Sequence, residues 1–243
     1  MCLDIRIQEG ALFIADAHDS AKRDYFFNFL TQLLDVPPPQ LFLMGDMFDV
    51  FIGNVTYTQQ RYAHYIELIN RLAKRCEIFY FEGNHDFNLS SCFEGVHIIP
   101  IQQQPQVAHF EDNTACLLLH GDCYEKGSYA LYTAWIRNSI TLKVLNVFDK
   151  LLGGGISKHM MNSQEKKELC RSIGHFKEII DAKIGQYPTD NIGLIIEGHY
   201  HQDKMFLYEN VCYINLASFA CTKRYFKVNT AEKTKLVPME FKP

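Results

Sequence analysis

Short runs of consecutive apolar residues recur along the chain, and most of them end directly before a polar motif. The runs span residues 11–15, 41–44, 78–81, 96–99, 115–119 and 193–196. Unbroken apolar runs of this length are typical of strands that are buried on both faces of a sheet. Two alternating runs, residues 211–215 and 224–228, have the pattern of further strands, which we expect to form a second sheet.

Helical periodicity fills the gaps between the first strands. Asp19 or Ser20 can cap a helix that continues through Leu34, and the prolines at positions 37–39 end it. A second helix is expected from about residue 57 to residue 74. The order strand, helix, strand, helix, strand predicts an α/β core whose site lies at the carboxyl ends of the strands.

Residues 124–184 differ from the rest, because they lack strand patterns and are rich in helix formers. Side chains from Tyr129 to Val144 give a broad aromatic and aliphatic face. The glycines at positions 153–155 interrupt this pattern, and a second helix is expected from Ser163. The triplet has the features of a flexible turn and not of a phosphate loop, because no strand precedes it and no Gly-Lys-Ser/Thr motif is present. We interpret the stretch as a helical insertion in a single domain of 243 residues.

Composition narrows the class of protein. The chain is 47% hydrophobic and 21% charged, which is typical of a folded globular protein with one substantial core. A net charge of −4 argues against specific nucleic-acid binding. No apolar run approaches the length of a membrane span, and the N-terminus lacks the features of a secretory signal. None of the eight cysteines forms a Cys-x-x-Cys pair, so we predict reduced, buried thiols in a cytoplasmic protein.

Five polar blocks follow predicted strands, at residues 16–18, 45–49, 83–86, 120–122 and 198–201. Alternate side chains of an extended segment point the same way, so Asp16 and His18 can share one metal, as can His199 and His201. A carboxylate at Asp46 can bridge two metals. The blocks together offer eight donor side chains: Asp16, His18, Asp46, Asn84, His85, His120, His199 and His201.

The donor set of oxygen and imidazole groups suits manganese, iron or zinc. Each block alone can be structural, and residues 84–86 alone can form a turn. Their joint occurrence in this order predicts a site for two divalent metal ions. The remaining histidines match no block and are expected on the surface or in packing: His64, His97, His109, His159 and His175.

The five blocks resemble the ligand motifs of the calcineurin-like metallophosphoesterase superfamily. The resemblance implies an α/β (α+β) four-layer sandwich, in which helices flank two mixed β-sheets. It also implies that two metals polarise a phosphoryl oxygen and activate a bridging water. His85 would protonate the leaving oxygen, oriented by Asp49; the alternative is that Asp49 only caps a helix. The implied ligands are Asp16, His18, Asp46 and His201 for one metal, and Asp46, Asn84, His120 and His199 for the other.

Residues 12–18 and 43–53, and the position of the insertion, resemble the bacterial UDP-2,3-diacylglucosamine pyrophosphatases of lipid A synthesis, in which the insertion forms a lid over acyl chains. This resemblance implies that the protein cleaves UDP-2,3-diacylglucosamine to UMP and 2,3-diacylglucosamine 1-phosphate. It also implies two divalent metal ions, for which manganese is the first candidate. One departure is His85, since arginine often follows the metal-binding asparagine in that family. Candidate substrate-binding residues are Asn84, Tyr132, Trp135, Lys166 and Lys167.

The insertion also carries basic residues that can meet phosphates or an anionic membrane, which predicts peripheral contact with the inner membrane. They are Arg137, Lys143, Lys158, Lys166, Lys167 and Arg171. The alternative is an ordinary amphipathic helix pair packed on the core. Two other functions stay open: a soluble phosphodiesterase or phosphatase for a nucleotide or phosphoprotein, and a scaffold without chemistry. The scaffold fits less well, because no ligand position has been lost.

Overall fold

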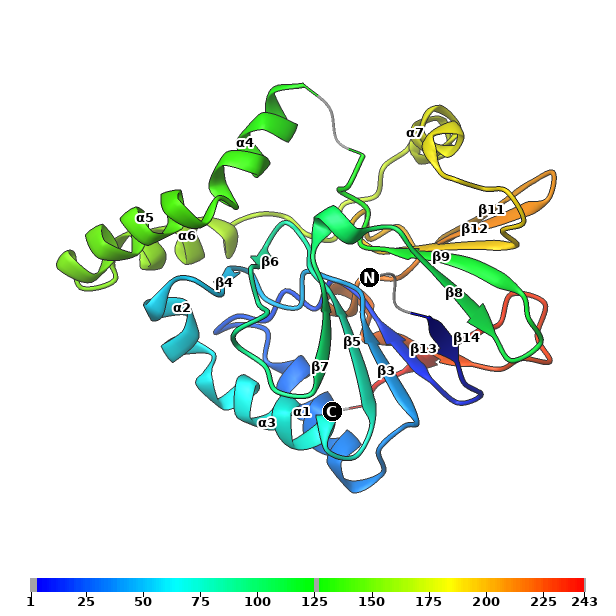
Figure 1. Cartoon of the computed structure of the whole chain (residues 1–243), viewed down its shortest axis with the longest axis horizontal. Helices are drawn as coiled ribbons and strands as arrows, with labels where there is room; N and C mark the ends of the chain where they lie inside the picture. Colours follow the sequence, from blue (N-terminus) through cyan, green and yellow to red (C-terminus); the bar gives the residue numbers. More distant parts are fainter. Residues whose placement is uncertain (1–3, 125–126, 243) are drawn as a thin grey trace.

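Two six-stranded sheets form the centre of the molecule (Figure 1). The computed structural model describes residues 4–124 and 127–242, without the side chains of residues 128–130 and 132. The first sheet has the order β1 (Ile5–Ile7), β8 (Gln106–Phe110), β9 (Ala115–Leu119), β10 (Leu194–Glu197), β12 (Val211–Asn215) and β11 (Lys204–Tyr208). The second has the order β14 (Leu236–Glu240), β13 (Arg224–Val228), β2 (Leu12–Ile14), β3 (Gln40–Leu43), β5 (Glu77–Phe81) and β7 (Val96–Ile99). Both sheets mix parallel and antiparallel pairs.

Helices cover the outer faces of both sheets. On the second sheet lie α1 (Tyr25–Asp35) and α3 (Ala63–Ala73), which follows the short α2 (Thr56–Arg61). On the first sheet lies α7 (Phe176–Lys183), and the short α8 (Phe219–Thr222) precedes β13. Two 3-10 turns, η1 (Ile101–Gln103) and η2 (Ile184–Gln186), and a two-stranded pair, β4 (Phe51–Ile52) with β6 (Asp86–Phe87), complete the core.

The period of two along each strand divides its side chains between two apolar layers. Leu41 and Leu43 of β3 face α1 and α3, whereas Phe42 between them faces the other sheet. Across the second sheet, the ring of Phe42 stacks between those of Phe13 and Phe79, with centroids 4.3 and 4.8 Å away. This arrangement, helix layer, sheet, sheet, helix layer, is the predicted four-layer sandwich.

Several sequence predictions need correction. The two alternating runs do not share one sheet, because β12 pairs with β10 and β13 pairs with β2. The first helix begins at Tyr25, since Ser20 and Arg23 form a bridged turn through their main chains. The second helix is interrupted at Tyr62, which ends α2 and precedes α3. The six unbroken apolar runs, in contrast, all form strands as predicted.

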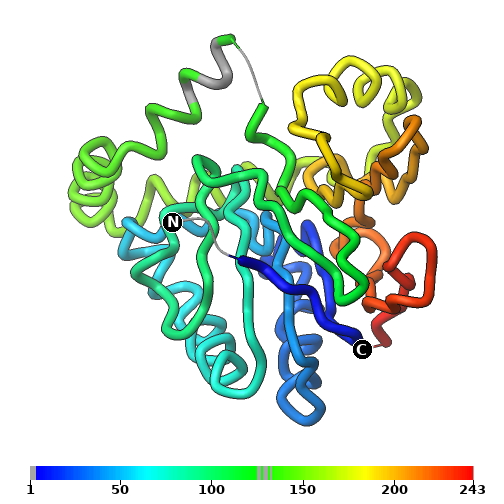
Figure 2. The backbone as a smooth tube through the Cα atoms, turned by 45° about the vertical axis from the view of Figure 1, so that its right-hand side comes forward, coloured from blue at the N-terminus to red at the C-terminus, as the bar shows by residue number. Residues whose placement is uncertain are grey.

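The insertion serves two different purposes in the fold. Helices α4 (Ser128–Ile136), α5 (Ser139–Leu151) and α6 (Gly155–Gln164) form an arm that projects from the sandwich, as Figures 1 and 2 show, whereas α7 packs on the first sheet. The helix expected from Ser163 is wrong, because α6 already begins at Gly155 and ends one residue later than Ser163. The glycine triplet is the turn between α5 and α6, with left-handed φ values at Gly153 and Gly154.

One side of the arm is anchored and the other is bare. Leu142 is buried against β4 and β6, and the Asn146 Oδ1 accepts a hydrogen bond from the Thr56 amide at 2.9 Å. The opposite side exposes eight large apolar residues, out of thirteen in the part of the chain that the structure describes. They are Leu131, Trp135, Ile140, Val144, Val147, Phe148, Leu151 and Leu152. We call this set the apolar face of the arm. The arm therefore packs on the core through one side, as the alternative of an amphipathic helix pair expected, but its outer face is apolar and not the solvated charged face of that alternative.

The prediction that all cysteines are reduced is also wrong. Cys170 and Cys221 form a disulfide, with Cα atoms 5.6 Å apart and a sequence separation of 51. Chain folding brings the segment after α6 against α8, and cysteine spacing in the sequence carries no sign of that contact. The other cysteines of the described residues are free, at positions 76, 92, 116, 123 and 212. Within residues 4–124 and 127–242, no helix is both long and apolar enough to cross a membrane.

A buried ion pair fixes α7 beneath the ends of β9 and β10. The Lys183 ammonium donates to the Gly121 carbonyl at 2.6 Å and to the Glu197 Oε1 at 2.5 Å, and Tyr187 donates its hydroxyl to the other carboxylate oxygen at 3.0 Å. Burial lowers the pKa of Lys183, but the Glu197 carboxylate outweighs burial and raises that pKa to about 12. Burial raises the pKa of Glu197, and the Lys183 ammonium opposes this effect, so each group of the pair favours the charged form of the other.

We expect Lys183→Met to destabilise the protein by about 3–5 kcal/mol, because the substitution leaves the Glu197 charge buried without its partner. Lys177→Met, on the same helix, is the matched control, since Lys177 lies at the surface in an i,i+4 pair with Asp181. Urea unfolding followed by circular dichroism measures both. Equal effects of the two substitutions would contradict this role of the buried pair.

Candidate metal centre

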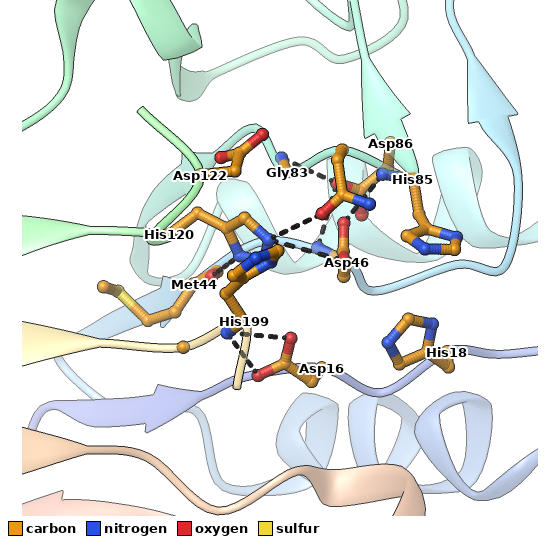
Figure 3. Close-up of polar contacts among 12 residues, drawn as sticks. Asp16, His18, Met44, Asp46, Gly83, His85, Asp86, His120, Asp122 and His199 are labelled. Carbon is orange, nitrogen blue, oxygen red and sulfur yellow. Dashed lines mark hydrogen bonds and ion pairs between the residues drawn. The ribbon is translucent and has the colours of Figure 1, made fainter. Parts of the chain in front are cut away.

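Six of the seven predicted ligands form two triads at the carboxyl ends of the central strands. Figure 3 shows the second triad, with Asp16 and His18 of the first. In each triad the donor atoms lie within 4.8 Å of one another. The first triad is Asp16, His18 and His201, and the second triad is Asp46, His120 and His199. Asn84, the seventh predicted ligand, lies beside the second triad, with its Oδ1 3.4 Å from the His120 Nε2. These residues follow β2, β3, β5, β9 and β10.

Hydrogen bonds at one ring nitrogen show which nitrogen each histidine offers. The Nδ1 of His120 faces the Met44 carbonyl at 2.9 Å, and the Nδ1 of His201 faces the Leu169 carbonyl at 2.9 Å. The Nδ1 of His18 lies 3.4 Å from a carboxylate oxygen of Asp49. The two carbonyls can only accept, so the Nδ1 of His120 and of His201 carries a proton and its Nε2 has a free lone pair. The His18–Asp49 contact is longer, and neither atom has a hydrogen-bond partner within the described residues, so it orients His18 by charge.

These Nε2 atoms converge on carboxylates and on one another. The Nε2 of His201 is 3.2 Å from the Asp16 Oδ1 and 3.2 Å from the His18 Nε2, and the His120 Nε2 is 3.4 Å from the Asp46 Oδ2. Two imidazole lone pairs at this separation repel unless a proton or a cation lies between them. The donor set of both triads therefore fits a divalent cation of the manganese, iron or zinc class.

The electrostatics of the triads lead to the same conclusion. Burial lowers the pKa of His201, but the Asp16 carboxylate outweighs it and raises this pKa to about 9. Burial opposes protonation of His120 as well, and Asp46 raises its pKa well above the ordinary value. Without metal, Asp16 and Asp46 thus favour the protonated forms of His201 and His120. A bound cation would replace these protons, which is how metal binding releases protons from such sites.

The backbone at the ligands is not extended. The expectation that Asp16 and His18, like His199 and His201, point the same way because they alternate along an extended segment is therefore wrong. Five ligands have left-handed φ values: Asp16 (52°), His18 (41°), Asp46 (54°), His199 (66°) and His201 (60°). The left-handed region costs a non-glycine residue about 1–2 kcal/mol, so the surrounding structure must hold these conformations. Main-chain hydrogen bonds do so between blocks, from the Asp16 amide to Gly45 at 3.1 Å and from the His18 amide to Asp46 at 3.0 Å.

Two glycines of the blocks are required by the close packing of the ligands. A Cβ at Gly83 would lie 2.2 Å from the Asp46 Oδ1, and a Cβ at Gly45 would lie 2.3 Å from the His120 Nδ1. Gly45 also has a φ of +88°. Any side chain at either position would displace a ligand, which explains why glycine precedes these ligand-bearing turns.

Asp86 supports the turns that carry the ligands, a role that the sequence analysis did not give it. Its fully buried carboxylate accepts hydrogen bonds from the amides of Asp46 and Gly83, both at 3.0 Å, and from the Tyr80 hydroxyl at 2.7 Å. Burial, together with the nearby Asp46 charge, raises the pKa of Asp86 to about 8. This one side chain holds the 45–49 and 83–86 turns together. Its signal in the sequence was its place at the end of the Asn84-His85-Asp86 motif.

The predicted pairing of the Asp49 carboxylate with His85 is wrong. The Nδ1 of His85 faces the main-chain carbonyl of Asp49 at 2.7 Å, not its carboxylate. The carboxylate instead accepts from the Arg23 guanidinium at 2.6 Å and faces His18. Arg23 also donates to the His18 carbonyl at 3.0 Å, and sequence reasoning missed it because 26 residues separate it from Asp49. Asp49 caps no helix, since the next helix begins at Thr56.

A cleft of about 190 Å³ lies between the metal centre and the arm. Its polar wall includes Asn84, His85, Arg137 and Lys167, and its apolar wall includes Phe87 and Met160. The Arg137 guanidinium is fixed by Asp122 and by the Gly83 carbonyl, both at 2.9 Å, and its Nε is buried without a partner in the described part of the chain.

Among the other predicted substrate-binding residues, Trp135 is 58% exposed on the apolar face of the arm and Lys166 is exposed, and neither lines the cleft. The side chain of Tyr132 lies outside the described residues. The triads of the described residues include none of the five histidines that match no block.

Comparison with known proteins is informative over most of the chain. The family model of the calcineurin-like phosphoesterases matches residues 11–203. Relatives include UDP-2,3-diacylglucosamine hydrolases from Blochmanniella pennsylvanica, 25% identical over 204 residues, with 79% of this chain and 78% of that protein covered, and from Marinobacter nauticus, 26% identical over 204 residues, with 79% and 80% covered.

A dimetal phosphatase of known structure from Danio rerio covers 96% of this chain and 99% of its own at 11% identity, with a TM-score of 0.44. That likeness is too distant to bear on activity. The family model, in contrast, spans the whole region that carries the five blocks. The chain therefore belongs to the calcineurin-like phosphoesterase family, whose members are hydrolases built around a dinuclear metal centre.

Proposed function

We propose that this protein hydrolyses the pyrophosphate bond of UDP-2,3-diacylglucosamine and releases UMP and 2,3-diacylglucosamine 1-phosphate. The observation that carries the proposal is an arm that lines the cleft beside the metal centre and exposes a bare apolar face outside that cleft. A nucleotide joined to acyl chains needs both parts, a polar site for the diphosphate and an apolar surface for the chains. The names of the relatives from Blochmanniella and Marinobacter support this choice.

The two triads would hold two divalent ions, with manganese as our first choice and iron or zinc as the others. Such ions, when bound, offset charge on phosphoryl oxygens and lower the pKa of water. The protein would hold one ion with the first triad and the other with the second triad and Asn84. We also propose that Asp46 binds both ions.

We assign His85 to protonation of the leaving oxygen. The residue lines the cleft, and the Asp49 carbonyl fixes the proton of its Nδ1. The protonated ring can then donate only from its Nε2, which sets the direction of proton transfer. In this assignment Asp49 has two separate effects: its carbonyl orients His85, and its carboxylate orients His18.

Arg137 is the residue we assign to the substrate phosphates. Its guanidinium is only 8% exposed, lines the cleft and reaches the Gly83 carbonyl, one residue before Asn84. An arginine is common directly after this asparagine in the family that the sequence resembles, whereas this chain has His85 there. Arg137 places a guanidinium beside the same turn from the end of α4, and its positive charge at the cleft wall attracts a phosphate.

The acyl chains are assigned to the apolar face of the arm. The cleft of about 190 Å³ is below the range of about 300–1,000 Å³ usual for small-molecule sites, so it cannot also enclose the chains. Residues 128–167 carry six Lys or Arg against two Asp or Glu, although the whole chain has a net charge of −4. Positive charge around an apolar face favours an anionic membrane, so we place the protein at the cytoplasmic side of the inner membrane.

The small volume of the same cleft favours a second candidate function, a soluble phosphodiesterase or phosphatase for a nucleotide or phosphoprotein. In that case the apolar face of the arm would not contribute to turnover. The two candidates share the metal centre and differ only in what lies beyond the phosphate.

The separate effects of Asp49 and His85 can be measured with two substitutions. Asp49→Asn should weaken Mn²⁺ binding about 10–100-fold, because His18 loses its carboxylate partner. His85→Ala should lower kcat about 10²–10⁴-fold through loss of the acid and leave Mn²⁺ affinity unchanged. Its amide, which donates to Asp46 at 2.8 Å, is kept. Calorimetric Mn²⁺ titration and steady-state kinetics separate the two. Unchanged Mn²⁺ affinity in Asp49→Asn would show that its carboxylate does not act through His18.

The substrate is tested with Mn²⁺-loaded protein, UDP-2,3-diacylglucosamine in mixed micelles and bis(p-nitrophenyl) phosphate as a small soluble ester. We expect release of UMP. Leu151→Ser on the apolar face should raise KM for the lipid about tenfold or more, since a buried leucine contributes about 1.5–3 kcal/mol, and should leave the soluble ester unaffected. Leu207→Ser, at a similarly exposed leucine of β11, is the control. Cleavage of the soluble ester without UMP release would reject the lipid substrate.

A further inference from the structure

The disulfide Cys170–Cys221 joins two segments that each contact a ligand of the first triad. Cys170 is exposed and lies in the connection from α6 to α7, which contains no helix or strand. Cys221 is half-buried in α8. No other disulfide ties the end of the arm to the core within the described residues.

On one side of the disulfide, the α6–α7 connection lies along His201 and its neighbour Gln202. The Leu169 carbonyl, adjacent to Cys170, accepts the Nδ1–H of His201 at 2.9 Å. Gln202 donates its side-chain amide to the Arg171 carbonyl at 3.1 Å and accepts the Ile173 amide at 2.8 Å. The position of this connection therefore decides whether His201 keeps the acceptor that fixes its ring.

On the other side, α8 is bound to Asp16. The Ala220 amide, adjacent to Cys221, donates to the Asp16 carbonyl at 3.1 Å, and the Ser218 hydroxyl donates to the same carbonyl at 2.9 Å. Ser218 and Phe219 thus hold the strand end that carries Asp16, because the Phe219 amide also donates to Ala15 at 2.9 Å. The disulfide connects the acceptor of His201 to the support of Asp16, and both belong to the first triad.

The α6–α7 connection has little else to hold it. Most of its residues between positions 165 and 175 are exposed, including both lysines and Arg171. Segments with few buried contacts open at low free-energy cost, so a covalent tether has a large effect on their position. A tether across 51 residues also removes much of the freedom of the untethered connection.

We propose that Cys170–Cys221 is a redox modification site that sets the affinity of the first triad for its metal ion. This inference rests on the proposed two-metal function. In the oxidised protein the tether keeps the Leu169 carbonyl on His201. In the reduced protein the α6–α7 connection moves away from His201, which then loses the acceptor that fixes its tautomer and ring orientation. Loss of such a partner typically costs about 10–100-fold in metal affinity.

The redox step needs an ordinary thiol reductant, either a small thiol or a protein dithiol. Its thiolate attacks the exposed Cys170 sulfur, and the Cys221 sulfur leaves as a thiolate that takes up a proton. A second reductant thiol then releases Cys170 as a thiol, so two electrons and two protons are gained and the reductant becomes a disulfide. Exposed disulfides in thiol-containing compartments are the labile and regulatory ones.

The test measures Mn²⁺ binding to the same protein in two redox states, without substrate. One sample is air-oxidised, and the other is treated with a phosphine reductant that is removed under anaerobic conditions before calorimetry. We expect two Mn²⁺ sites in the oxidised protein, one of which weakens about 10–100-fold on reduction while the other is unchanged. Reoxidation should restore the affinity. Hydrogen exchange in residues 165–175 should become faster on reduction.

Variants separate the redox effect from misfolding. The double variant Cys170→Ser/Cys221→Ser should show the weak affinity in both conditions, and Cys212→Ser, at a free cysteine of β12, should keep the redox shift. Equal Mn²⁺ affinities in both redox states would overturn the inference, as would alkylation of both cysteines in the air-oxidised protein. If Mn²⁺ affinity follows the redox state but UMP is not released, only the proposed substrate fails.

Discussion

The acceptors at the Nδ1 atoms of His18, His120 and His201 are the contacts on which the rest of the metal centre depends. Two are main-chain carbonyls, of Met44 and Leu169, and the third is the Asp49 carboxylate. The two carbonyls fix the proton of His120 and of His201 on the outer nitrogen, so the inner lone pairs converge beside Asp46 and Asp16, and the Asp49 charge faces the His18 ring. Without them, the same residues would be buried histidines beside carboxylates, with no preferred direction for a cation.

The sandwich is what keeps these contacts in place. Five ligands lie in left-handed backbone, a conformation that only a well-packed surrounding can maintain. Buried strands end just before each ligand, and Asp86 ties two of the turns together. The Lys183–Glu197 pair lies at the end of β10. The stability of the core and the geometry of the site are therefore linked, and Glu197 is separated from the ligand His199 only by Gly198.

Much of this arrangement could be predicted from the sequence, because the unbroken apolar runs and the polar blocks are local signals. The runs all form strands, and six of the seven predicted ligands meet in the two triads. Long-range contacts could not be predicted, because no local pattern in the sequence records them. They are the Arg23–Asp49 ion pair, the Cys170–Cys221 disulfide and the assignment of β12 and β13 to different sheets. The apolar pattern of α5 was visible, but which side of it packs depends on Leu142 meeting β4 and β6.

In our two proposals, the apolar face of the arm binds a lipid, and the disulfide couples the affinity of the first triad to the redox state. Both proposals depend on the two triads binding metal. Anomalous diffraction at the manganese edge, from crystals grown with Mn²⁺, tests this most directly. The account predicts two peaks, one among Asp16, His18 and His201 and the other among Asp46, His120 and His199. A single peak, or none at the triads, would contradict it.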